Sequence, residues 1–250
     1  MRLARFCYKD RICFGVVTND EIIVAKGDMF GEYKLTKKKV SLSAVKLLPP
    51  TEPSKIVAVG LNYKAHTEEF GEDVPDEPRL FLKPASAVIG HKDDIIIPEQ
   101  SQRVDYEAEL AIVISKKCSK ISEEEAGEYI LGYTCLNDVT ARDLQKKDGQ
   151  WTRAKGFDTF APIGPWIETE LNPDSVSISL LLNGEVMQSS NTNMFIFKTR
   201  QLVSYISNVM TLLPGDIITT GTPSGVGPMK SGDVVTVKID GIGELINNVK

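Results

Sequence analysis

Acidic side chains alternate along one extended stretch of the sequence, Asp105-Tyr106-Glu107-Ala108-Glu109. Residues two apart in a β-strand share a face, so the three carboxylates would point the same way. Two carboxylates about 4 Å apart repel by roughly 4 kcal/mol at an effective dielectric constant of 20. Near a core, such a pair has to share a proton or meet a cation. The segment therefore predicts either a cation site or, if the strand lies at an edge, a solvated acidic face.

A third acid, Asp138, follows the apolar segment that ends in Cys135-Leu136-Asn137. With Glu107 and Glu109 it would offer three oxygen ligands, which suit Mg²⁺, Mn²⁺ or Ca²⁺ better than zinc or copper. Zinc is also disfavoured because the four cysteines form no CxxC pair and the sequence has only two histidines.

His66 and Glu69 are candidates for acid–base chemistry because they lie three residues apart in a segment that is expected to be helical. On a helix, residues with this spacing share a face. A carboxylate that holds one imidazole nitrogen leaves the other available as a general base. The alternative is an exposed helix that carries the two residues by chance.

Two cations and a glycine-rich segment could contact a substrate. Arg142 and Lys155 lie just beyond Asp138 and could pair with a carboxylate, which Arg does with a bidentate fork. The alternative for each is a solvated surface cation. The segment 221–227, GTPSGVG, lacks the ending of a phosphate-binding Walker motif. It is either a turn that touches substrate or a plain loop.

The composition bounds the kind of protein. The chain has 250 residues with a formal net charge of -5, which argues against a nucleic-acid partner. Hydrophobic residues make up 42%, enough for a full core. We find neither the apolar stretch of a signal peptide nor an apolar run of the ~18 residues needed to span a membrane. A cytoplasmic protein without a membrane partner is therefore expected, with its cysteines reduced.

The elements that must position these residues are mostly strands. Short strands are predicted over 2–8, 12–18 and 21–25, followed by a solvated stretch at Lys37-Lys38-Lys39 and a proline-rich connection at 49–53. We expect residues 1–50 to form a small β-rich domain and 51–250 the catalytic domain. Because strands dominate without regular βαβ alternation, a mixed, mainly antiparallel α+β fold is favoured.

In the second domain, strands are predicted near 56–60, 80–83, 94–97, 106–115, 216–220, 233–239 and 243–248, and another leads to Asp138. Short helices are expected around His66, from the capping box of Ser122 and Glu125, and over 140–147. Asn183-Gly184 signals a hairpin. Helical spacing of apolar residues from Leu202 to Leu213 predicts an amphipathic helix that ends at Pro214-Gly215.

Taken in order, several of these segments resemble the fumarylacetoacetate hydrolase family over roughly residues 56–249. Each string alone is weak, but the ordered set is specific. The matching pieces are GLNY at 60–63 with His66 and Glu69, FLKP at 81–84, DYEAEL at 105–110, NDVTARD at 137–143, WTRAKGFD at 151–158 and GTPSGVG at 221–227. Leu61 departs from the pattern, since many members carry Arg there.

The resemblance implies a mixed β-sandwich roll, usually a homodimer, that binds Mg²⁺ or a similar ion through Glu107, Glu109 and Asp138. It implies that His66 with Glu69 activates water and that Lys155 stabilises developing negative charge. It also implies that Arg142, Gln145 and Thr222 lie near the bound substrate, while Asp105 stays outside the ligand set.

The activity expected first is hydrolysis of a C–C bond in an acylpyruvate-type 1,3-diketo acid. The cation would hold the 2-oxo and carboxylate oxygens, and His66 would deprotonate the attacking water. The alternative uses the same enolate for oxaloacetate decarboxylation or for isomerisation of an unsaturated diacid, as in a 2-hydroxyhepta-2,4-diene-1,7-dioate isomerase. A metal-stabilised binding protein without turnover is a third, less favoured hypothesis, because a pure binder needs no base.

Overall fold

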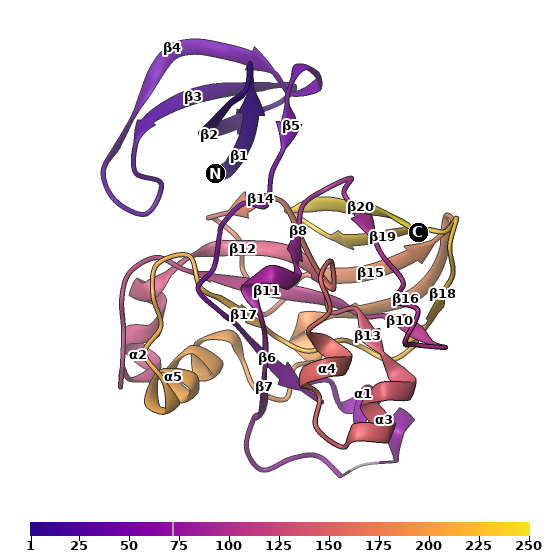
Figure 1. Cartoon of the computed structure of the whole chain (residues 1–250). Coiled ribbons are helices and arrows are strands. Elements are labelled where there is room, and N and C mark those ends of the chain that lie inside the picture. Colours follow the sequence, from indigo (N-terminus) through magenta and orange to yellow (C-terminus); the bar gives the residue numbers. More distant parts are fainter. Residues whose placement is uncertain (72) are drawn as a thin grey trace.

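The N-terminal strands form an antiparallel meander that lies apart from the bulk of the molecule in Figure 1. The computed structural model describes residues 1–71 and 73–250. The strands of the meander are β1 (Arg2–Tyr8), β2 (Arg11–Thr18), β3 (Glu21–Gly27) and β4 (Tyr33–Ser41), and the short β5 (Lys46–Leu47) pairs with β1. They enclose a small hydrophobic cluster of their own around Phe6 and Ile22.

Strand β4 was missed, because the sequence predicted only a solvated stretch at Lys37-Lys38-Lys39. The three lysines are exposed, as expected, but they belong to a strand that pairs with β3. Their charge hid the strand because both faces of this edge strand are open to water at the three lysines, and lysine is common on edge strands. At the other edge of the meander, Arg2 and Leu3 of β1 pair with β14 (Ala161–Glu168), so the N-terminal strands continue the main sheet. The predicted division at residue 50 stays a prediction.

The main sheet runs in the order β4-β3-β2-β1-β14-β12-β11-β17-β6-β7. Its central strand β11 (Ala108–Ile114) lies between β12 (Ile130–Asn137) and β17 (Ile217–Thr219), and every residue of β11 is buried. This burial on both faces explains the apolar run after Glu109. Beyond β17 come β6 (Ile56–Gly60) and β7 (Arg79–Lys83), and β8 (Val88–Ile89) pairs with β14.

A second sheet packs against the first, in the order β16-β15-β19-β20-β9. Its strands are β15 (Ser177–Leu182), β16 (Glu185–Asn191), β19 (Val234–Ile239), β20 (Gly243–Val249) and β9 (Asp94–Ile95). Leu180 and Val237 of this sheet share one hydrophobic core with Leu110 and Ile112 of β11. The two layers confirm the strand-rich sandwich. The predicted hairpin is also present, formed by β15 and β16. Asn183 and Gly184 in its turn both have positive φ, as a tight primed turn requires.

The predicted strand over 106–115 is interrupted at Glu107, which corrects its extent. Before Glu107 the chain runs in β10 (Val104–Tyr106), which pairs with β13 (Thr140–Ala141) and β18 (Gly227–Met229) in a small separate sheet. After Glu107 it enters the main sheet as β11. The interruption places Glu107 where two sheets meet, which a period-2 pattern in the sequence cannot reveal.

The described helices are short. Three of them, α1 (Lys64–Phe70), α3 (Arg142–Asp148) and α4 (Thr152–Lys155), gather at one end of the molecule in Figure 1. The predicted capping box starts α2 (Glu123–Ala126), where Ser122 and Glu125 each accept from the other's backbone N–H. Helix α5 (Thr199–Val209) stops short of the predicted end, because Leu212 turns away to bridge Cys118.

No described helix combines the length and hydropathy needed to cross a membrane. The cysteines are free in the described residues, and the register of β1 and β2 sets Cys7 opposite Ile12 rather than Cys13.

Candidate active site

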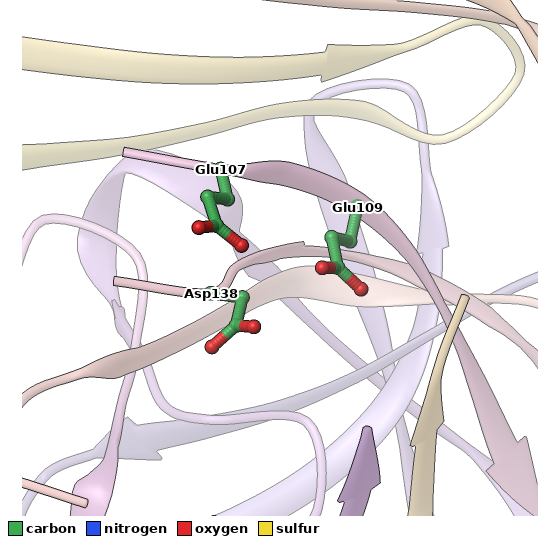
Figure 2. A group of neighbouring side chains, drawn as sticks. All are labelled: Glu107, Glu109 and Asp138. Carbon is green, nitrogen blue, oxygen red and sulfur yellow. The ribbon is translucent and has the colours of Figure 1, made fainter. Parts of the chain in front are cut away.

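Glu107, Glu109 and Asp138 converge at one end of the main sheet, and their carboxylates point into a common space in Figure 2. Each offers an oxygen that lies within 4.8 Å of the others. Glu107 precedes β11, Glu109 lies within it, and Asp138 follows the neighbouring strand β12. All three are at least 95% buried, with exposures of 5%, 2% and 0%. The solvated acidic face considered for this segment is therefore wrong.

The backbone around the carboxylates is tied down locally. The N–H of Asp138 donates to the carbonyl of Glu107 at 2.9 Å, and the Asn137 side chain accepts from the N–H of Glu107 at 2.9 Å. Thr140 Oγ1 donates to Glu107 Oε1 at 3.0 Å and to the carbonyl of Asp138 at 2.8 Å. Glu107, which precedes β11, and Asp138, which follows β12, are thus held in place by neighbouring polar groups.

Buried cations flank two of the acids. Lys155 Nζ contacts Glu107 Oε2 at 2.9 Å and Asp138 Oδ2 at 2.6 Å, and Arg142 forms a further ion pair with Glu107. Burial by itself would raise the pKa of Glu107, but Lys155 and Arg142 outweigh it and hold the pKa below its ordinary value. Lys155 is 2% exposed and Arg142 is 6% exposed, so neither is the solvated cation considered above.

Lys83 completes this arrangement and was missed as a site residue by the sequence reasoning. It lies at the end of β7, is fully buried, and contacts Asp138 Oδ1 at 2.6 Å and the carbonyl of Val139 at 3.1 Å. Burial lowers its pKa, although Asp138 opposes the shift. Its signal in the sequence was a lysine that follows three apolar residues at the end of a strand, directly before Pro84.

Glu109 differs from the other two acids. It accepts a hydrogen bond from the N–H of Gly221 at 2.8 Å, and no ion pair is found for it among the described residues. Burial, followed by repulsion from Asp138 and Glu107, raises the pKa of Glu109 well above its ordinary value. A buried carboxylate in this situation has to bind a proton or a cation. The oxygen-only ligand set and the uncompensated charge together fit a hard divalent cation.

Asp105, which shares the acidic pattern, belongs to a different interaction. Its carboxylate is fully buried and accepts from Arg103 at 2.8 Å and from Arg142 at 2.9 Å. It lies in β10, before the interruption at Glu107, and is absent from the cluster of potential ligands in the described residues. Asp105 therefore anchors Arg142 beside the three acids.

His66 lines the same cavity as the three carboxylates, and the volume of this cavity is about 250 Å³. Its Nδ1 lies 3.0 Å from Glu69 Oε2, and Glu69 also accepts from the N–H of Gly225 at 3.2 Å. Helix α1 thus brings together the predicted pair, and His66 is 6% exposed rather than on an open helix face. If Nδ1 carries the proton that Glu69 accepts, Nε2 is left as the basic nitrogen.

The cavity wall joins polar and apolar groups from several segments. Arg142 donates to the Gln145 side chain at 2.7 Å on α3, and Thr222 lines the cavity from the glycine-rich loop. The glycine-rich loop therefore contributes to the cavity wall, and its contact with substrate stays a prediction. The apolar part of the wall includes Phe81 and Trp151, whose rings meet edge to face at 5.0 Å.

Leu61, the departure from the family pattern, also lines the cavity. Its φ of 59° lies in the left-handed region, which costs a residue with a Cβ roughly 1–2 kcal/mol. Asn62 holds the turn, because its amide donates to the carbonyls of Phe197 at 3.1 Å and Thr220 at 2.8 Å and accepts from the N–H of Phe197. The hydrogen bonds of the buried Asn62 side chain thus hold Leu61 in its strained backbone conformation next to the cavity.

Two family models match the chain. The model for the C-terminal domain of fumarylacetoacetate (FAA) hydrolase matches residues 55–250, and an Rv2993c-like N-terminal model matches residues 1–50. The mitochondrial oxaloacetate tautomerase of Xenopus laevis is 45% identical over 230 residues, covering 87% of this chain and 71% of the relative.

Solved structures extend the comparison. A 2-hydroxyhepta-2,4-diene-1,7-dioate isomerase from Mycobacterium marinum has a TM-score of 0.94 and 43% identity, covering 100% of this chain and 98% of that one. A maleylpyruvate hydrolase from Sphingobium sp. SYK-6, in complex with manganese(II) and pyruvate, has a TM-score of 0.84 and 33% identity, with coverage of 100% and 98%. These similarities agree with the site, where three buried carboxylates fit a divalent cation.

Proposed function

Because this chain belongs to the fumarylacetoacetate hydrolase family, whose members are enzymes, we propose that it catalyses an enolate-forming reaction of a small 2-oxo acid with a divalent cation. One observation carries the proposal: the buried triad Glu107, Glu109 and Asp138 lines the same cavity as His66, which Glu69 contacts. A binding protein without turnover would need the carboxylates but not the base.

The cation proposed is Mg²⁺ or Mn²⁺, with Ca²⁺ as a third oxygen-preferring ion. The manganese complex of the maleylpyruvate hydrolase supports this choice. When bound, such a cation polarises the 2-oxo group and makes the C3 proton of the substrate more acidic. Lys83, Arg142 and Lys155 already pair with Glu107 and Asp138, and Glu109 has no ion pair among the described residues, so a bound divalent ion would bring more positive charge than Glu109 alone neutralises. That excess favours an anionic substrate.

The protein's own residues supply positioning and proton transfer. Arg142, Gln145 and Thr222 line the cavity and orient the carboxylate of the substrate, with Arg142 held in place by Asp105. The Lys155 ammonium lies at the wall of the cavity and stabilises negative charge that develops on the substrate oxygen. His66 takes up or returns a proton at carbon or at water, oriented by Glu69.

The reaction we favour is proton transfer at C3, as in tautomerisation of oxaloacetate or isomerisation of an unsaturated 2-oxo diacid. The support is the higher identity to the tautomerase and the isomerase, 45% and 43%, than to the hydrolase, 33%. His66 would remove a proton from C3, and the proton would return to oxygen or to the distal carbon. Decarboxylation of oxaloacetate instead breaks the bond between C3 and the distal carboxylate, releases carbon dioxide and leaves the pyruvate enolate, so it needs no base.

The second candidate is the C–C hydrolysis expected first from the sequence. Water deprotonated by His66 would add to the distal carbonyl of an acylpyruvate, and the bond to C3 would break to give a carboxylic acid and the pyruvate enolate, which is then protonated. The maleylpyruvate hydrolase with bound pyruvate supports this candidate. Both reactions use the same cavity, and the identity of the substrate separates them.

A turnover panel with added Mn²⁺ decides between these reactions. Acetylpyruvate, fumarylpyruvate, oxaloacetate and an unsaturated 2-oxo heptanedioate are followed by proton NMR in D₂O. Exchange at C3 or a shifted double bond without cleavage is the expected result, whereas pyruvate and a free acid would favour hydrolysis. If no substrate changes, the proposal fails and a binding protein becomes the better interpretation.

Substitution of the base tests the mechanism in the same assay. His66→Ala should lower proton transfer and hydrolysis by about 10²–10⁴, the typical contribution of a general base. Cation affinity should survive, since His66 is not a proposed ligand, and any decarboxylation should fall much less. Glu69→Gln should act in the same direction but more mildly. Equal losses of all three reactions in His66→Ala would assign this residue to binding or closure instead.

A cytoplasmic location and a homodimer, both expected from the sequence, belong to the same proposal. The tautomerase of Xenopus laevis is named as a mitochondrial protein, which does not support the cytoplasmic location. Size-exclusion chromatography with light scattering tests the assembly, and a mass of a single 27.6 kDa chain would contradict the homodimer.

A further inference from the structure

Gln188 is a buried amide on β16, a strand whose other residues are exposed or half-buried. Its side chain is 1% exposed and forms three hydrogen bonds. Oε1 accepts from the N–H of Ala108 at 2.9 Å, and Nε2 donates to Thr222 Oγ1 at 2.9 Å and to the carbonyl of Pro223 at 2.8 Å. Both amide hydrogens and the amide oxygen are therefore engaged.

The first bond fixes the strand that carries the cation ligands. Ala108 lies between Glu107 and Glu109, at the point where the chain enters the main sheet. The neighbouring strand β17 pairs with β11 only from Ala111 onward, so it offers no acceptor to the N–H of Ala108. Gln188 supplies that acceptor from the opposing sheet and holds the backbone between the two ligands.

The other two bonds fix the glycine-rich loop. In this loop the N–H of Gly221 donates to Glu109 and the N–H of Gly225 donates to Glu69, so the loop contacts both the ligand cluster and the base pair. The loop also packs tightly on β16, because a Cβ added to Gly225 would lie 2.5 Å from the carbonyl oxygen of Met187. Gln188 thus contacts the ligand strand directly and reaches Glu69 through the loop.

We infer that Gln188 is a positioning residue that sets the cation-binding carboxylates and the His66–Glu69 pair at a fixed separation. Its oxygen acts on Glu107 and Glu109 through the Ala108 backbone, and its nitrogen acts on Glu69 through the loop. The consequence for turnover rests on the proposed function, whereas the consequence for cation binding does not. A partner of this kind outside the ligand set typically contributes 10–100-fold to metal affinity or activity.

A purely structural role makes a different prediction, and Asn247 provides the matched control. Asn247 is also 1% exposed, and its amide donates to the carbonyls of Gly90 at 2.9 Å and Asp93 at 2.8 Å. It lies in β20 and does not line the cavity. Loss of either amide leaves buried backbone groups without a partner, so Gln188→Met and Asn247→Leu should both lower the melting temperature.

The decisive experiment measures Mn²⁺ affinity by calorimetry in these two variants of the full chain, together with kcat and KM. Gln188→Met should weaken Mn²⁺ binding or lower kcat at saturating Mn²⁺ by about 10–100-fold, while Asn247→Leu should keep both within about twofold. Unchanged Mn²⁺ affinity and kcat in folded Gln188→Met, or equal losses in Asn247→Leu, would overturn the inference.

A second variant separates the two halves of the contact and replaces the first if Gln188→Met does not fold. Gln188→Glu keeps an acceptor for Ala108 but loses the donor to Thr222 and Pro223. Its Mn²⁺ affinity should be at least that of Gln188→Met, with kcat still lowered about 10-fold or more. Full recovery of kcat would overturn the role of the loop contact. If the wild-type protein turns over no 2-oxo acid, the proposed function fails, and the Mn²⁺ affinities still decide the role of Gln188.

Discussion

At the scale of residues, chemical type alone does not separate the acids of this site, but surroundings do. Asp105 and Glu109 lie four positions apart and are both fully or nearly fully buried, at 0% and 2% exposure. Asp105 meets two guanidinium groups, and its charge is satisfied within the protein. Glu109 meets one backbone N–H and two other carboxylates. Only the second environment gains by binding a cation.

This contrast yields a prediction for metal affinity. Glu109→Gln should weaken Mn²⁺ binding by more than about 100-fold, because it removes a charged ligand, whereas partners outside the ligand set contribute about 10–100-fold. Asp105→Asn should weaken it by less, since it acts only through Arg142. Calorimetric titration of both variants measures the difference. Equal losses would mean that Asp105 belongs to the ligand set.

At the scale of elements, the site depends on the turn that follows β17. Gly221 has a φ of 86°, its N–H holds Glu109, and a Cβ there would lie 2.9 Å from Cβ of Asn62. Gly232 has a φ of 93° with no atom within 4 Å of such a Cβ. The two glycines therefore have similar positive φ angles and differ in the space around them.

Alanine at these positions separates strain from crowding. Gly232→Ala should cost roughly 1–2 kcal/mol of unfolding free energy from the left-handed conformation alone. Gly221→Ala should cost more and should also weaken Mn²⁺ binding, because the turn shifts away from Glu109. Urea denaturation and calorimetry measure the two effects. If Gly221→Ala were no worse than Gly232→Ala in both, the turn would not position Glu109.

At the scale of the whole molecule, the ligands come from strands in the centre of the main sheet, so cation binding should stabilise the entire fold. A ligand at 100 times its Kd adds about 2.7 kcal/mol of stability. For a chain of this size, that corresponds to a rise in melting temperature of roughly 5–11 °C. Excess EDTA should reverse the rise.

Thermal melts with Mg²⁺ or Mn²⁺ test this, with Glu109→Gln as the control that should respond little. An unchanged melting temperature of the wild-type protein in millimolar Mn²⁺ would contradict the proposed cation site. A rise of equal size in Glu109→Gln would place the stabilising ion elsewhere on the molecule.

Much of the local structure could be predicted because local patterns suffice for it. The capping box at Ser122, the Asn183-Gly184 turn and the buried strand after Glu109 follow from side-chain chemistry within a few residues. Strands β4 and β14, helix α4 and the end of α5 were missed or misplaced. Their boundaries depend on distant partners, as where Leu212 leaves the helical pattern to bridge Cys118.

From the sequence alone, the candidate residues and, through the ordered motifs, the family could be predicted. For the acids, His66 and Lys155 the functional and the structural interpretations stayed open, because the type of a residue does not tell whether its side chain is buried or exposed. The folded structure resolves these alternatives, because burial removes the water that would otherwise solvate a charged side chain. It also revealed Lys83 and Gln188, which lie 55 residues before Asp138 and 80 residues after Ala108. Such contacts join strands from different parts of the chain, and no local spacing encodes them.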